Sequence, residues 1–121
     1  MGIEQRHYIR VSYRQTVSLK TSAGLELLAQ TDNISVAGLG IVCDQVTACS
    51  IVPGGRYFNL NEAVNITVEL CLEGEGALRI SCKVHSARRL AEDSYGFNLE
   101  ITDIKDVDKQ LLGGFINQQR C

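Results

Sequence analysis

The sequence predicts an all-β fold, a six-stranded antiparallel β-barrel with one α-helix at its C-terminal end. Most of the chain alternates apolar and polar residues with a period of two, as half-buried strands do. Short runs of glycine and polar residues separate the alternating segments. The last part of the chain instead repeats its apolar residues with the period of a helix. Because six strands joined by tight turns would leave two exposed edges in an open sheet, we expect a closed barrel.

The three clearest strands lie in the second half of the chain. Apolar and polar residues alternate over 64–72, 78–85 and 95–101. The glycine-rich EGEG segment at 73–76 predicts a tight turn between the first two of these strands. AEDS at 91–94 predicts a second turn, so the three strands should form an antiparallel meander.

The first half predicts three further strands, in the runs VSYRQTVSLKT, LELLAQTDNIS and GLGIVCD. TSAG at 21–24 separates the first two. The segment CSIVPGGRYFNLNEA at 49–63 holds the only proline, followed by two glycines, and predicts a long loop with one helical turn.

The C-terminal segment predicts a helix over 103–119, with Asp103 as its N-cap and Asp106 in its first turn. The apolar residues that share one helical face are Ile104, Val107, Leu111, Leu112, Phe115 and Ile116. The chain therefore reads as a single domain over 1–121. It divides into an N-terminal arm (1–10), which we expect to be flexible, the barrel (11–102) and the helix (103–119).

Composition narrows the class of protein. With 121 residues and 45% apolar residues, the chain can bury one core. A net charge of −2 argues against a DNA- or RNA-binding surface. Residues 1–20 nevertheless carry four basic residues against one acidic residue, which favours a small anionic ligand near the N-terminus. Without a long apolar run or a signal peptide pattern, we expect a cytoplasmic protein that does not insert into a membrane.

The cysteines indicate neither a metal site nor a nucleophile. There are five, and no pair has the spacing of a zinc knuckle. Cys43, Cys71 and Cys82 fall in predicted strands, where we expect buried, reduced thiols. An enzyme using Cys49 with His85 would need a Cys–His motif that the sequence lacks. We therefore expect a protein that is not an enzyme.

Two short motifs contain the candidate binding residues. Arg6 and Arg10 lie four residues apart at the start of the chain. Guanidinium groups bind phosphate and the guanine edge bidentately and stack on aromatic rings, although a solvated pair is the commoner reading. In DNISVAGLG, Asn33 and Ser35 would face outward from an extended strand, while Gly38 would allow close approach. A strand end followed by a turn explains the same residues.

Together, Arg6-x-x-x-Arg10 and Asn33-x-Ser35-x-x-Gly38, ahead of the strand pattern and the terminal helix, resemble the PilZ domain. This family is a bacterial receptor module for the second messenger cyclic di-GMP. The resemblance implies that both arginines contact guanine edges, ring faces and phosphates. It implies that Asn33 binds a guanine edge, that Ser35 binds a guanine or phosphate group, and that Gly38 leaves room for the ligand.

Three more residues are weaker candidates. Many family members have another arginine just before the first one, and this chain has Gln5 there. In the family that position is associated with binding one ligand molecule or a stacked pair, so Gln5 favours a single molecule. His7 and His85 could add contacts, although both are expected to be exposed to solvent.

The resemblance implies a cytoplasmic bacterial receptor or adaptor, a monomer or weak homodimer, that needs no cofactor besides its ligand. Cyclic di-GMP would order the arm onto the barrel and so create a surface for a downstream partner protein. The alternative keeps the fold and works through protein contacts alone, without binding cyclic di-GMP.

Overall fold

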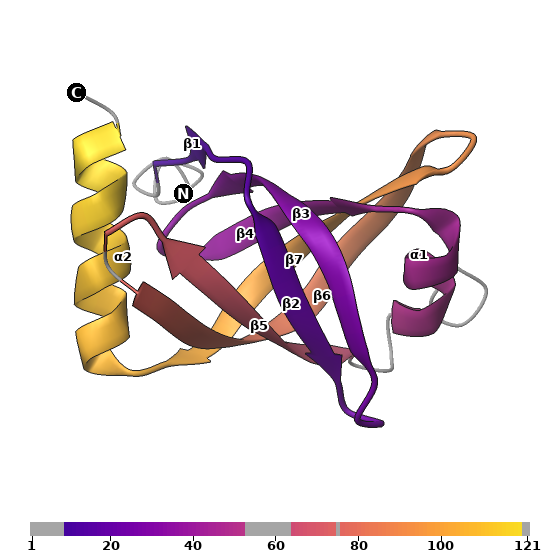
Figure 1. Ribbon diagram of the computed structural model, residues 1–121, viewed down its shortest axis with the longest axis horizontal. Coiled ribbons are helices and arrows are strands. Elements are labelled where there is room, and N and C mark those ends of the chain that lie inside the picture. The colour runs from indigo at the N-terminus through magenta and orange to yellow at the C-terminus, as the bar shows by residue number, and fades with distance from the viewer. Residues whose placement is uncertain (1–8, 53–63, 75, 120–121) are drawn as a thin grey trace, which may run out of the picture.

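The computed structural model describes residues 9–52, 64–74 and 76–119. Its elements, in chain order, are β1 (Val11–Ser12), β2 (Thr16–Thr21), β3 (Glu26–Ile34), β4 (Gly38–Cys43), α1 (Gln45–Ile51), β5 (Asn65–Leu72), β6 (Gly76–Ala91), β7 (Ser94–Ile104) and α2 (Asp106–Gln119). Figure 1 shows the strands as a barrel, with α2 along one side and α1 on the other.

Six strands close into an antiparallel β-barrel, which confirms the predicted fold. The strands follow the order β3, β2, β5, β6, β7, β4, and β4 pairs back with β3. The short strand β1 also pairs with β3, where Val11 lies opposite Ile34. Since β2 pairs with β3 only as far as Gln30, β1 occupies the part of the β3 edge that β2 leaves open.

The alternation of apolar and polar residues correctly predicts which strand residues form the core. Residues at every second position of the strands are buried, among them Leu19, Val68, Ile80 and Leu99. The turns at 21–24, 73–76 and 91–94 connect consecutive strands, as predicted. Three glycines in the first two turns adopt positive φ (Gly24, Gly74 and Gly76), a conformation that residues with a side chain rarely take.

The helix near residue 49 begins earlier than expected. It starts at Gln45, directly after the run GLGIVCD that was expected to form a strand, because Asp44, the last residue of that run, caps the helix. An oxygen of the Asp44 carboxylate accepts a hydrogen bond of 2.8 Å from the Thr47 backbone N–H. This bonding to Thr47 lowers the pKa of Asp44. The rest of the predicted loop, 53–63, lies outside the described residues.

The terminal helix begins later than expected. Asp103 pairs with Ser81 in the β6–β7 ladder, so its assignment as N-cap is wrong. Leu112, Phe115 and Ile116 are buried as predicted, whereas Val107 is 59% exposed. Pairing with β6 extends the strand through Ile104 and delays the helix.

Of the four cysteines among the described residues, two are buried and two are exposed. Cys43 and Cys82 lie in the core, while Cys49 and Cys71 are exposed and all four are free thiols. The prediction for Cys71 is wrong because its neighbours Leu70 and Leu72 point inward, which leaves Cys71 on the outer face. In the part of the chain that the structure describes, no helix is both long and apolar enough to span a membrane.

Candidate ligand-binding groove

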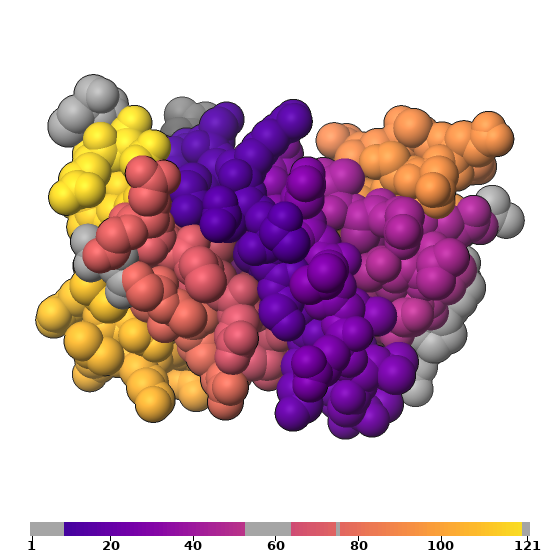
Figure 2. All heavy atoms as spheres, in the orientation of Figure 1, coloured from indigo at the N-terminus to yellow at the C-terminus, as the bar shows by residue number. Residues whose placement is uncertain are grey.

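A groove of about 350 Å³ lies on the outer face of the barrel, across β3, β4, β7 and β6. The residues that matter most for its chemistry are Asn33, Gly40, Ser86, Arg88, Leu90 and Asn98. In Figure 2 the first described residues (indigo) and the β6–β7 hairpin (orange) stand apart along the upper edge of the molecule.

A β-bulge in β3 shapes one wall of the groove. Thr31 pairs with Ile41 and Asn33 pairs with Gly40, so Asp32 is an extra residue between the two pairs. The bulge interrupts the alternation. Asp32 and Asn33 consequently both line the groove, while Thr31 and Ile34 are buried.

The structure brings two of the predicted residues together. The Arg10 guanidinium donates a hydrogen bond to the side-chain oxygen of Asn33. This contact depends on β1, in which Ser12 pairs with Asn33. A residue of the N-terminal arm and a residue of the second motif therefore meet beside the groove.

Thr31 anchors the chain that follows β1. Its side chain is buried, and its hydroxyl donates to the Tyr13 carbonyl and accepts from the Gln15 backbone N–H at 3.0 Å. The Thr31 N–H also donates to the Gln15 carbonyl at 2.9 Å. These bonds hold residues 13–15, which follow β1, against β3.

The prediction that Ser35 faces outward is wrong. It is 1% exposed, and its hydroxyl accepts hydrogen bonds from the backbone N–H groups of Ala37 and Gly38, at 3.1 and 3.0 Å. The same hydroxyl donates to the Gly38 carbonyl at 3.2 Å. β3 ends at Ile34, so the simple strand alternation no longer applies, and Ser35 shapes the turn into β4.

Gly38 allows a close approach, but of a neighbouring strand. A Cβ atom on Gly38 would lie 2.4 Å from the carbonyl oxygen of Leu99 in β7. The packing of β4 against β7 is therefore sufficient reason for a glycine at this position.

The remaining candidates are not part of the described groove. Gln5, Arg6 and His7 lie outside the described residues. His85 is exposed, as expected, and is not among the groove-lining residues. It is the extra residue of a bulge in β6, between Val84 and Ser86.

Sequence reasoning missed several groove residues that the strand register brings together. Asn33 pairs with Gly40, Gly40 with Asn98, and Asn98 with Ser86. These four residues form a row across four strands. The sequence signal was that small and amide residues occupy outward positions in the segments GLG (38–40) and GFN (96–98). Only the strand register shows that these residues are neighbours.

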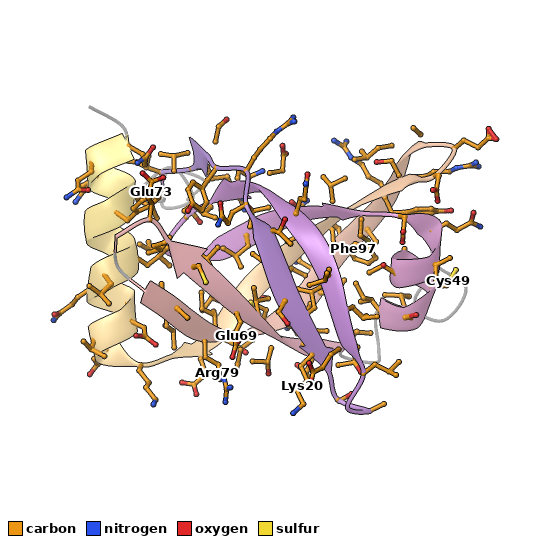
Figure 3. The ribbon with its side chains drawn as sticks, viewed as in Figure 1. Lys20, Cys49, Glu69, Glu73, Arg79 and Phe97 are labelled. Carbon is orange, nitrogen blue, oxygen red and sulfur yellow. The ribbon has the colours of Figure 1, made fainter. Side chains whose placement is uncertain are left out.

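Asp32 and Arg88 both line the groove, and the exposed arginines of the barrel differ in whether they form an ion pair. Arg10 is exposed beside the groove and Arg88 lines it. Neither forms an ion pair with another described residue. On the face drawn below in Figure 3, Arg79 is instead paired with Glu69, with 3.0 Å between nitrogen and oxygen. No group of three or more His, Cys, Asp or Glu among the described residues could hold a metal ion.

Comparisons with known proteins identify the family. The family model of the PilZ domain matches residues 4–118, and no curated protein sequence matches the chain. Among solved structures, the PilZ domain of Escherichia coli YcgR with c-di-GMP has a TM-score of 0.68 at 12% identity, over 96% of this chain and 92% of that one.

Two longer proteins have similar folds. The inhibitor of motility MotI/DgrA of Bacillus subtilis has a TM-score of 0.61 at 21% identity, over 95% of this chain and 51% of that one. Borreliella burgdorferi PlzA in complex with c-di-GMP has a TM-score of 0.57 at 14% identity, over 98% of this chain and 54% of that one. The chain thus spans about half the length of these two proteins. Since the family model covers nearly the whole sequence, the chain belongs to the PilZ domain family.

Proposed function

We propose that this protein is a receptor that binds cyclic di-GMP in the groove on the outer face of the barrel. The observation that carries the proposal is the contact between Arg10 and Asn33 beside a groove that Arg88 also lines. Membership of the PilZ family supports it. So do the similar structures of YcgR and PlzA, both solved with c-di-GMP.

The chemistry of these side chains suits a cyclic dinucleotide. Guanidinium groups bind phosphate and the guanine edge through paired hydrogen bonds. The Asn33 amide can both donate and accept. We assign Ser35 and Gly38 to the shape of the β3–β4 turn rather than to direct contact, because both are buried. Arg6 keeps the ligand-binding role that the family motif implies, and Gln5 favours one ligand molecule per chain.

The proposed output is a protein contact and not a reaction. Ligand binding would order the arm against β3 and the groove, and the combined surface would be recognised by a partner protein. The helix α2 is the described element best placed to sense this change. Phe115 of α2 meets Tyr13, just after β1, with the ring centroids 5.0 Å apart and the rings nearly perpendicular.

Isothermal titration calorimetry with cyclic di-GMP tests the proposal. The wild-type protein should bind one molecule per chain, and Arg10→Ala should weaken binding more than tenfold, since hydrogen bonds to charged groups contribute about 1.5–3 kcal/mol each. Arg10 is exposed, so the melting temperature without ligand should barely change. Arg79→Ala is the matched control, because it removes an exposed arginine away from the groove and breaks only a surface ion pair.

Two outcomes would contradict the proposal. No binding by the wild-type protein at tens of micromolar ligand would favour an adaptor that works through protein contacts alone. Equal binding by Arg10→Ala and Arg79→Ala would show that the groove is not the site.

A further inference from the structure

The end of the groove away from Arg10 contains a second side-chain amide. In the row across the strands, Asn33 and Asn98 both pair with Gly40, one from each side. Strands in a sheet lie about 4.8 Å apart, so the Cα atoms of the two asparagines lie roughly 10 Å apart. Gly40 has no side chain of its own, and the Asn33 side chain leans over it, because a Cβ atom on Gly40 would lie 2.6 Å from the Asn33 Nδ2 atom.

The orientation of the Asn98 amide is set by Ser86. The Nδ2 atom of Asn98 donates a hydrogen bond of 3.0 Å to the Ser86 Oγ, and the two residues are partners in the β6–β7 ladder. Oδ1 is the acceptor of the amide and takes no part in this bond, so it can accept from a ligand, while the second Nδ2 hydrogen can still donate. Asn98 is exposed to solvent, so this oxygen is accessible.

An apolar surface lies beside Asn98. Leu90, in the β6–β7 hairpin, is 46% exposed and lines the groove. It packs over Gly96, where a Cβ atom would be only 3.2 Å from its Cδ1 atom. Gly96 and Asn98 are two residues apart in β7, on the same face of the strand. A planar ring resting on Leu90 would therefore turn an edge toward Asn98.

We propose that Asn98 recognises guanine by accepting a hydrogen bond at Oδ1 from the exocyclic amino group of the base. In this arrangement Leu90 contacts the face of the ring and Ser86 is a positioning residue that orients the amide. Adenine and hypoxanthine carry a hydrogen where guanine carries this amino group, so neither can make the bond. This assignment rests on the proposed function and adds the source of its base specificity.

The test compares cyclic di-GMP with its inosine analogue, cyclic di-IMP, by calorimetry. The wild-type protein should bind cyclic di-GMP about five to ten times more tightly than cyclic di-IMP. Asn98→Ala should weaken cyclic di-GMP binding by about the same factor and leave cyclic di-IMP binding unchanged, so that the preference disappears. Asn65→Ala, at an exposed asparagine of β5 outside the groove, should keep it.

The Ser86 variants separate orientation from contact. Ser86→Ala should lose part of the preference for guanine, because the amide is no longer held. Ser86→Thr retains the hydroxyl and should behave as the wild type. Thermal melts of all variants should agree within a few degrees, since Asn98 is exposed and Ser86 only partly buried.

Each outcome has a separate meaning. A wild-type protein that binds no cyclic di-GMP would overturn the proposed function, and this inference with it. Wild-type binding together with an unchanged guanine preference in Asn98→Ala would overturn the inference alone. Equal weakening of both ligands by Asn98→Ala would also overturn it, because the amide would then not read the base.

Discussion

Two glycines in β4 lie two residues apart and differ in what surrounds them. A Cβ atom on Gly38 would meet the backbone of Leu99 at 2.4 Å. A Cβ atom on Gly40 would meet the Asn33 Nδ2 atom at 2.6 Å. A backbone held in a barrel ladder cannot move away, whereas a side-chain amide can rotate. The first glycine therefore serves the fold and the second serves the groove.

The two alanine variants should separate these roles. Gly38→Ala should lower the free energy of unfolding by about 1–3 kcal/mol, as overpacking does. Gly40→Ala should change it by less than about 1 kcal/mol, but it should weaken cyclic di-GMP binding because the Asn33 amide is displaced. Urea denaturation and calorimetry measure the two effects. A stable Gly38→Ala protein, or full binding by Gly40→Ala, would contradict this division.

At the scale of elements, α2 packs against both the segment after β1 and the turn between β3 and β4. Phe115 packs against the Tyr13 ring. Gly113 lies next to Val36, which belongs to the turn that Ser35 shapes, and a Cβ atom placed on Gly113 would lie 3.8 Å from the Cγ1 atom of Val36. The Tyr13 hydroxyl also donates to the Cys71 carbonyl at 3.0 Å, at the end of β5. Burial is the main cause that raises the pKa of Tyr13. Through Tyr13, the segment that positions Arg10 is tied to the helix and to β5.

Variants of Tyr13 test this connection. Tyr13→Phe keeps the ring contact and loses one hydrogen bond, so it should cost about 1 kcal/mol of stability and leave ligand affinity unchanged. Tyr13→Ala removes the ring and should weaken cyclic di-GMP binding as well, because the segment that positions Arg10 loses its contact with α2. Calorimetry beside thermal melts distinguishes the two variants. Equal affinity in both would show that α2 does not influence the groove.

The whole molecule is held together by a closed barrel whose core includes two thiols. Burial raises the pKa of Cys43 from 9.0 to about 11 and that of Cys82 to about 12. In the unfolded chain these thiols ionise near pH 9, while the folded protein still holds both protons. The folded state binds more protons in this range, so stability must fall as pH rises.

The free energy of unfolding should therefore decline from about pH 9 toward pH 11. Tyr13 acts in the same direction, because its pKa is also raised. Cys82→Ala should be less stable at neutral pH but show a shallower decline than the wild type. Urea titrations across this range measure both slopes. Equal slopes would mean that the Cys82 thiol does not contribute.

The sequence by itself determined the class of fold and indicated two segments that contribute to the candidate site. Period-two alternation and turn residues are local properties, so the strands, the three tight turns and the barrel could be predicted from them. The N-terminal motif and the segment around Asn33 could be recognised for the same reason. Arg10 and Asn33 do meet, as that pairing of motifs suggested.

Only the tertiary structure decided how the groove is lined. One extra residue at Asp32 breaks the alternation of β3, and the turn after Ile34 buries the Ser35 side chain that the simple pattern placed outside. The row from Asn33 to Ser86 depends on the register of four strands, some of them far apart in the chain. Register is set by packing across the whole barrel, and no local pattern contains it.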